Sequence, residues 1–140
     1  MTKRLIVTVG LPHSGKSTWA RQQGFPIVNP DSIRLAMHGQ VFAEKAEPWV
    51  WAFAYAMAEA LFLSGHDTVI VDATNTTDKR RKPWLERFQK PDKGFEVEFK
   101  IFETPPDECK RRAWTDKRND LIPVIDRMLA QWDLPKPEGW

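Results

Sequence analysis

A glycine-containing loop near the start of the chain, residues 10–17, has the sequence G-L-P-H-S-G-K-S. An apolar run at residues 5–9 precedes it, and a helix-forming stretch at residues 16–23 overlaps its end. This setting is that of a P-loop, whose backbone N–H groups surround phosphate oxygens at the start of a helix. The flanking segments favour this interpretation over a chance match. The chain is therefore predicted to bind a nucleoside triphosphate.

The residue types within the loop predict how the nucleotide is held. Lys16 reaches the β- and γ-phosphates, and the hydroxyl of Ser17 is placed to ligate Mg²⁺. The expected cofactors are therefore ATP, or another nucleoside triphosphate, and Mg²⁺. The residues of this region that are expected to contact the nucleotide are Gly10, Pro12, His13, Ser14, Gly15, Lys16, Ser17 and Thr18.

Segments with strand and helix patterns alternate along the chain. Strands are predicted at residues 5–9, 27–28, 67–72 and 95–102, and helices at 16–23, 33–38, 48–64, 78–88, 105–112 and 122–132. The alternation predicts an α/β fold with a mostly parallel sheet of about four strands and helices on both faces. Together with the loop at residues 10–17, this is expected to be a P-loop NTPase/kinase fold. Apolar and charged residues alternate at 95–102, which favours a place nearer the sheet edge. The 140 residues are predicted to form one domain, 1–140, with a proline-rich tail at 134–140.

Composition restricts the classes of partner. The formal net charge of +2 does not by itself indicate affinity for nucleic acid, although basic residues cluster at 79–82 and 110–118. The longest apolar stretch, residues 49–63, contains Glu59 and is too short for a membrane span, which needs about 20 apolar residues. It is predicted to be a buried helix, with a base-stacking platform as the alternative. The single Cys109 excludes an internal disulfide, and no signal peptide is visible, so a cytoplasmic protein without membrane or disulfide-linked partners is expected.

Polar residues follow several of the predicted strands. In a parallel sheet, ligands bind at the carboxyl ends of the strands, so residues 10–17, 29–34 and 72–75 are expected to share one rim. Asp31 and Arg34 are three residues apart and share a helical face. Asp31 is the candidate general base for transfer to a hydroxyl group, and Arg34 is the candidate ligand of an acceptor phosphate. The alternative is an N-cap aspartate beside a surface arginine.

Other residues near this rim have two interpretations each. Asp72 ends an apolar strand, so it either contacts Mg²⁺, possibly through water, or caps a turn. Thr74, Asn75 and Arg80 are candidates for substrate binding. The basic residues at 79–82 lie in the first turns of a helix, where positive charge opposes the helix dipole, although Thr77 or Asp78 as a cap would offset part of that cost. The run is either a site for an anionic partner or a solvated face.

A second basic run, residues 110–118, is a candidate arginine-bearing lid. In P-loop kinases such an arginine stabilises the charge on the transferring phosphoryl group. Arg118 is preferred as the lid arginine because it lies in a less regular stretch, and Arg112 is the second candidate. A solvent-exposed charge run is the alternative for at least half of these residues.

The chain resembles the kinase domain of the phage polynucleotide 5′-hydroxyl kinases along its whole length. The resemblance is carried by G-L-P-H-S-G-K-S-T-W-A-R at residue 10, N-P-D-S-I-R at residue 29 and T-N-T-T-D-K-R-R at residue 74. A weaker similarity covers K-R-R-A-W-T-D-K-R at residue 110, before I-P-V-I-D-R-M. The loop between Arg112 and Pro123 departs from the family's spacing, which leaves the choice between Arg118 and Arg112 open.

The resemblance implies an ATP-dependent kinase that phosphorylates the 5′-hydroxyl end of DNA or RNA in the cytoplasm, that of a host cell if the protein is phage-encoded. Lys16 and Ser17 would bind the triphosphate and Mg²⁺, Asp31 would be the general base, Arg34 would hold the acceptor's 3′-phosphate and Arg118 would be the lid arginine. No D-x-D-x-T phosphatase signature occurs, so no 3′-phosphatase activity is expected. The alternatives are a kinase of a nucleoside, a small metabolite or a hydroxymethylated base in DNA, and a non-catalytic nucleotide-binding switch. No guanine-binding N-K-x-D motif is present.

Overall fold

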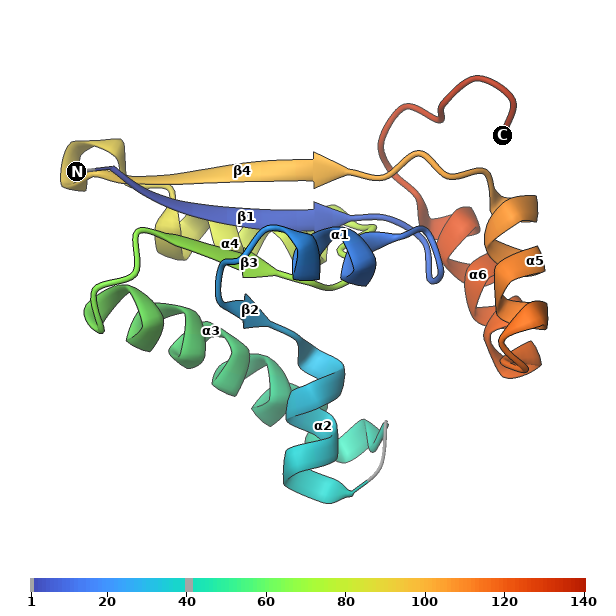
Figure 1. The fold of residues 1–140 in the computed structure, drawn as a ribbon, viewed down its shortest axis with the longest axis horizontal. Coiled ribbons are helices and arrows are strands. Elements are labelled where there is room, and N and C mark those ends of the chain that lie inside the picture. The colour runs from blue at the N-terminus through green and yellow to red at the C-terminus, as the bar shows by residue number, and fades with distance from the viewer. Residues whose placement is uncertain (1, 40–41) are drawn as a thin grey trace.

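The computed structural model describes residues 2–39 and 42–140, and its centre is a four-stranded parallel sheet (Figure 1). The strands are β1 (Lys3–Val9), β2 (Ile27–Val28), β3 (Thr68–Val71) and β4 (Phe95–Ile101). Their order across the sheet is β2-β3-β1-β4. The predicted parallel α/β fold is therefore confirmed, and β4 lies at an edge, as its alternating pattern indicated.

Six α-helices connect and follow the strands. They are α1 (Lys16–Gln22), α2 (Pro30–His38), α3 (Glu47–Leu63), α4 (Asp78–Phe88), α5 (Pro106–Thr115) and α6 (Ile122–Gln131). Short 3-10 turns precede α3, β4 and α6, at Glu44–Ala46, Pro91–Lys93 and Asn119–Leu121. The helices begin and end within about three residues of the predicted bounds. Four of them, α2, α3, α5 and α6, have proline in the first turn, and glycine follows α2 and α3, so these signals are visible in the sequence.

The two faces of the sheet are covered unequally. On one face, side chains from β1, β2 and β3 pack against α3 and α4 in the largest apolar cluster. On the other face, Ile6 and Ile70 pack against Ala20 of α1. The central strands are apolar in both alternate sets because both of their faces are buried. The buried residues 5–9 of β1 and 69–71 of β3 include no charged side chain, whereas Glu96 and Glu98 of the edge strand β4 are exposed to solvent.

Helices α5 and α6 pack beyond the carboxyl ends of β1 and β4, at the right of Figure 1. Their apolar cluster joins the end of β1 to both helices through Val9, Cys109 and Ile125. The proline-rich tail packs onto this unit, since the ring of Trp140 lies 4.8 Å from that of Trp132. The result is that α5 stands directly beside the P-loop.

Helix α3 is buried on one face only, which corrects the prediction that it is a buried helix. Val50, Ala54 and Ala58 are fully covered, whereas Trp49 and Leu63 are 66% and 81% exposed. The physical reason is that a single helical layer lies over this side of the sheet, so the far side of α3 meets no second layer. Within 2–39 and 42–140, no helix is long and apolar enough to cross a membrane.

The basic run at 79–82 is partly satisfied inside the protein. Arg81 is buried, and its guanidinium bonds to the carbonyl of Asn75 and to the carboxylate of Asp133. The other carboxylate oxygen of Asp133 accepts the N–H of Asp78, at 2.6 Å. The first turn of α4 is therefore satisfied by Asp133 and not by the side chain of Thr77 or Asp78. Local sequence patterns could not predict this role of Asp133, because it lies more than 50 residues from Asp78 and Arg81 in the sequence.

Candidate nucleotide and acceptor site

The P-loop follows β1 and turns back toward α1, and two of its positions require glycine. A Cβ on Gly10 would lie 2.6 Å from the hydroxyl oxygen of Ser14 and 3.0 Å from the Cβ of Phe102. Gly15 has a φ of +100°, in the left-handed region that other residues adopt only with strain. Because Gly10 leaves no room for a side chain and Gly15 adopts a φ that is strained for other residues, the backbone can close tightly enough to point its N–H groups at a phosphate.

Lys16 is buried within this loop. Its ammonium group donates hydrogen bonds to the carbonyl of Leu11, at 2.6 Å, and to the hydroxyl of Ser14, at 3.3 Å. Burial lowers the pKa of Lys16 to about 8, and the negative charge of Asp72 offsets only part of that shift. A bound triphosphate would supply anionic acceptors in place of two neutral ones, so it would favour the charged form.

This lowered pKa predicts a pH dependence of nucleotide binding. Lys16 is charged below pH 8 and loses its charge as the pH rises through that value, so the Kd for ATP is expected to increase above pH 8. The Kd rises by at most about tenfold per pH unit, a limit that is reached if only the charged form of Lys16 binds ATP. Titration calorimetry between pH 7 and 9.5 measures it. Lys16→Ala should bind weakly with a flat profile, and an equally steep profile in that variant would assign the dependence to another group.

Three oxygen- and nitrogen-bearing side chains meet beside the loop. The hydroxyl of Ser17 donates to Asp72, at 2.6 Å, and the amide of Asn29 donates to the same carboxylate oxygen, at 3.2 Å. Residues 10–17, 29–34 and 72 therefore share one rim, as the order of the parallel strands requires.

The Ser17–Asp72 pair fits a magnesium ion. A hydroxyl and a carboxylate are hard oxygen donors, and Mg²⁺ is typically held by one or two such groups together with substrate phosphates and water. Across the residues that the structure describes, no group of three or more His, Cys, Asp or Glu side chains forms a complete metal cage. The donor set is thus suited to an ion that arrives with a nucleotide.

Asp31 and Arg34 form an ion pair at the start of α2. The distance between Arg34 Nη1 and Asp31 Oδ1 is 2.7 Å. Asn29 is the N-cap of this helix, because its side-chain oxygen accepts the N–H groups of Asp31 and Ser32, at 2.8 and 3.2 Å. The alternative that Asp31 itself is the cap is wrong. Its carboxylate is 63% exposed, so it is accessible to a ligand at the rim.

Glu47, at the start of α3, is a member of this cluster that the sequence did not reveal. Its two carboxylate oxygens accept hydrogen bonds from Arg34, at 2.6 and 2.9 Å, and both side chains are about 15% exposed. Burial alone would lower the pKa of Arg34, but the bonds to Glu47 and Asp31 raise it overall. The guanidinium is therefore permanently charged and fixed in direction. A glutamate before a proline indicates a helix start, but nothing local connects it to Arg34.

The remaining predicted substrate residues separate into two groups. Arg80 lies at the rim, half-buried, with its guanidinium 4.2 Å from the ring centre of Trp51. Asn75 does not face the rim as predicted: it is buried, and its amide donates to the carbonyl of Thr8, at 2.9 Å. Thr74 contributes its carbonyl, which accepts the N–H of Gly10, at 2.9 Å. The loop after β3 therefore supports the P-loop through its backbone and through a buried amide.

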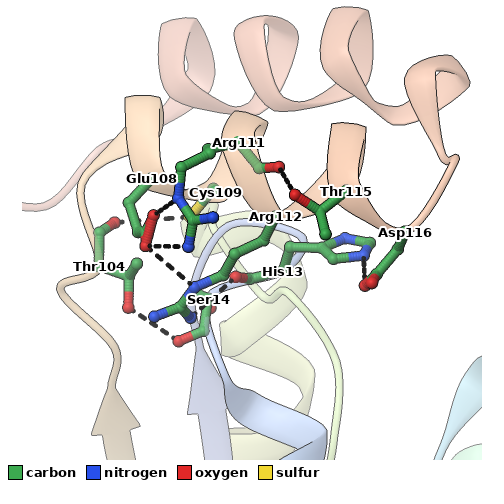
Figure 2. Close-up of polar contacts among 9 residues, drawn as sticks. All are labelled: His13, Ser14, Thr104, Glu108, Cys109, Arg111, Arg112, Thr115 and Asp116. Carbon is green, nitrogen blue, oxygen red and sulfur yellow. Dashed lines mark hydrogen bonds and ion pairs between the residues drawn. The ribbon is translucent and has the colours of Figure 1, made fainter.

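Helix α5 contacts the P-loop directly (Figure 2). Thr104, just before the helix, donates its hydroxyl to the carbonyl of Ser14, at 2.9 Å. Arg112 donates to the carbonyl of His13, at 3.3 Å, and the imidazole of His13 meets Asp116 at 3.1 Å. These contacts hold the P-loop against α5. Thr104 and Asp116 were not predicted, because only the packing of α5 brings them to the loop.

The two candidate lid arginines differ in position. Arg112 contacts the P-loop, and its Nη1 lies 3.8 Å from where a Cβ of Gly15 would stand. Arg118 lies beyond the end of α5 and pairs with Asp120, with both distances 3.1 Å. Arg112 therefore contacts the loop itself, whereas Arg118, which the sequence favoured, has its pKa raised by its bond to Asp120 and also by the charge of Asp31. The choice between the two arginines stays a prediction. A lid movement stays a prediction.

A P-loop after the first strand of a parallel sheet, with a carboxylate at the end of the neighbouring strand, is the arrangement of P-loop kinases. A family model described as an AAA domain, AAA_33, matches residues 5–134. The chain belongs to this family, which supports nucleotide binding and a kinase-like phosphotransferase activity. The finer resemblance to the phage enzymes stays a prediction.

Solved structures of differently named proteins show the same fold. A chain of the Pnkp1/Rnl/Hen1 complex is 29% identical over 79% of this chain, with a TM-score of 0.68. A chain of the Pnkp1/Rnl/Hen1 RNA repair complex is 22% identical over 97%, with a TM-score of 0.66. Mycobacterium tuberculosis APS kinase CysC, solved with AMPPNP and APS, is 19% identical over 80% of this chain and 69% of its own length, with a TM-score of 0.58. This chain spans 39% and 49% of the two repair-complex chains.

Proposed function

We propose that the protein is an ATP-dependent kinase that transfers the γ-phosphate to the 5′-hydroxyl end of DNA or RNA. The observation that carries the proposal is the cluster of Asp31, Arg34 and Arg80 at the rim, next to Ser17 and Asp72. It combines a carboxylate for a hydroxyl proton with two guanidiniums for an anionic acceptor. The likeness to a chain of the Pnkp1/Rnl/Hen1 complex, which is described as an RNA repair complex, supports a polynucleotide as that acceptor.

The donor half of the site is formed by the P-loop. The loop N–H groups and Lys16 hold the β- and γ-phosphates, which neutralises charge that would repel an incoming hydroxyl. Ser17 and Asp72 would hold Mg²⁺, whose chemistry is to neutralise and orient the phosphate oxygens. Arg112 is the candidate for stabilising the transferring phosphoryl group because it contacts the loop, and Arg118 is the second candidate.

The acceptor half is formed by α2 and the start of α3. Asp31 would accept the proton of the 5′-hydroxyl as the oxygen bonds to the γ-phosphorus and ADP leaves. Arg34 would hold a phosphate of the acceptor through paired N–H donors, with that phosphate taking the place of one carboxylate partner. Glu47 is a positioning residue, because it fixes the direction of Arg34 when no acceptor is bound.

Arg34→Ala is expected to weaken acceptor binding more than catalysis. The variant removes a half-buried, charge-assisted phosphate ligand but leaves Lys16 and Asp31 in place, so the KM for a 5′-hydroxyl oligonucleotide should rise by about tenfold or more. The KM for ATP should change little. Steady-state kinetics with each substrate varied separately makes the measurement. A variant with the wild-type KM for the oligonucleotide contradicts the acceptor role of Arg34.

The proposed function is tested by transfer of labelled γ-phosphate from ATP to a panel of acceptors. The panel contains 5′-hydroxyl oligonucleotides, the same oligonucleotides with 5′-phosphates, free nucleosides and DNA with hydroxymethylated bases. Label on 5′-hydroxyl ends alone supports the proposal. Label on the phosphorylated controls or on nucleosides assigns the same fold to another acceptor, and ATP binding without any transfer favours a nucleotide-binding switch.

A further inference from the structure

Two arginines of α4 lie over aromatic rings of α3. The guanidinium of Arg80 is 4.2 Å from the ring centre of Trp51, and that of Arg87 is 4.4 Å from the ring centre of Tyr55. Neither guanidinium has a hydrogen-bond or carboxylate partner among residues 2–39 and 42–140, in contrast to Arg81, which is bonded to Asp133. A guanidinium stacked on a ring keeps its edge N–H groups free for an anion, and little side-chain freedom is left to lose on binding.

The two arginines continue the acceptor cluster along the line where α3 and α4 meet. Glu47 and Arg34 lie close enough to Arg80 to affect its pKa, which burial lowers. The rings of Trp51 and Tyr55 are 6.4 Å apart, and Tyr55 also packs on Trp84, at 4.6 Å. Residues 80 and 87 are two helical turns apart, or about 10 Å. We refer to Arg34, Arg80 and Arg87 as the arginine row.

A cavity of about 420 Å³ lies at the end of the arginine row, between the last turns of α3 and α4. Tyr55 and Arg87 belong to both the row and the cavity, so the two are continuous. The cavity has aromatic walls, which include Phe62 and Phe95, and four basic side chains, Lys3, Arg87, Lys90 and Lys93, against the carboxylates Glu59 and Glu86. Its volume and its apolar walls with a few charged groups are typical of a small-ligand site and are sufficient for one nucleotide.

We infer that the surface between α3 and α4, from the arginine row to the cavity, binds the acceptor strand beyond its 5′ end, and we refer to this surface as the groove. Non-specific sites for single strands combine a basic groove that follows the phosphates with aromatic side chains that receive bases, which is the combination found here. The arginine row contacts successive phosphates, and the cavity receives a nucleotide farther along the strand. Helix α3 has 17 residues, a length of about 25 Å, so the groove accommodates several nucleotides. This inference rests on the proposed function, because it names the path of the same acceptor.

The test compares Arg87→Ala with Lys82→Ala in binding to a 3′-fluorescein-labelled single-stranded decanucleotide. Both residues are exposed on α4, but Lys82 lies outside the groove and has Glu86 as its neighbour, at 4.0 Å. Arg87→Ala should weaken binding roughly fivefold or more at low salt, and should reduce the slope of log K against log salt by about 0.7, the value for one phosphate contact on a single strand. Lys82→Ala should match the wild type in both quantities.

The salt slope separates ligand binding from a structural role. If Arg87 served only to pin the ring of Tyr55, thermal stability would fall and the slope would stay at the wild-type value. A wild-type affinity and slope in Arg87→Ala, or a wild-type protein that does not bind the decanucleotide, overturns the inference. Phosphoryl transfer is measured on the same samples: binding that depends on Arg87 without transfer refutes the proposed function alone, whereas transfer with an unchanged Arg87→Ala variant refutes the groove alone.

Discussion

Asp31→Ala is expected to lower kcat for phosphorylation of a 5′-hydroxyl end by about 10²- to 10⁴-fold, which is the usual contribution of a positioned general base. The carboxylate lies at the rim beside Arg34 and is open to ligands, and Asn29 performs the capping of α2. Removing the carboxylate therefore removes the proton acceptor without removing the helix cap. ATP binding should be retained, because no P-loop residue bonds to Asp31.

The fold of the acceptor side should survive the Asp31→Ala substitution. Arg34 keeps its two bonds to Glu47 in that variant, so the acceptor phosphate would still find its ligand. The measurement is single-turnover transfer of labelled phosphate, with Asp107→Ala, an exposed aspartate at the start of α5, as the matched control. Turnover by Asp31→Ala at the rate of Asp107→Ala would remove Asp31 from the mechanism.

Lys16→Ala is expected to reduce phosphoryl transfer by about 10³-fold or more, because its ammonium group is the buried charge that faces the β- and γ-phosphates. ATP affinity should fall with it. The loss should not reflect unfolding: burial disfavours the charged form of this lysine, as its pKa of about 8 indicates, so the Tm of the variant should be no lower than that of the wild type.

The Lys16→Ala experiment needs a control for removal of positive charge. Lys79→Ala deletes an exposed lysine of α4 that bonds to nothing in the P-loop, and its transfer rate should equal the wild-type rate. Transfer rates and thermal midpoints are measured on the three proteins together. Transfer by Lys16→Ala within tenfold of the wild type would contradict the role given to the loop lysine.

The residues that would bind the acceptor distinguish the proposed polynucleotide kinase from a kinase of another acceptor. The P-loop, Lys16 and the Ser17–Asp72 pair suit any kinase of this fold, and an APS kinase has the same fold. Features that suit a long anionic acceptor lie elsewhere, in the arginine row and the cavity at its end. Binding of the decanucleotide therefore tests the acceptor class independently of the chemistry.

Local patterns in the sequence predicted the parts of the protein whose cause is local. The P-loop was predictable because Gly10 and Gly15 occupy turns that only glycine fits, between a strand and a helix of characteristic composition. The parallel sheet was predictable because strands buried on both faces are continuous apolar runs. The spacing of Asp31 and Arg34 also placed them on one face, since residues three apart on a helix are neighbours.

Contacts between distant segments decided the remainder. Packing of α3 beside α2 gives Arg34 its second partner, Glu47, and the C-terminal segment supplies Asp133 to the first turn of α4. Packing of α5 on the loop brings Arg112 into contact with the carbonyl of His13, and the amide of Asn75 becomes a buried support by donating to the carbonyl of Thr8. Helix periodicity and strand alternation repeat over two to four residues, so they determine which segments form helices or strands and which side chains share a face of each segment. The partner of each charged side chain depends on how those elements pack, and only the tertiary structure determines that.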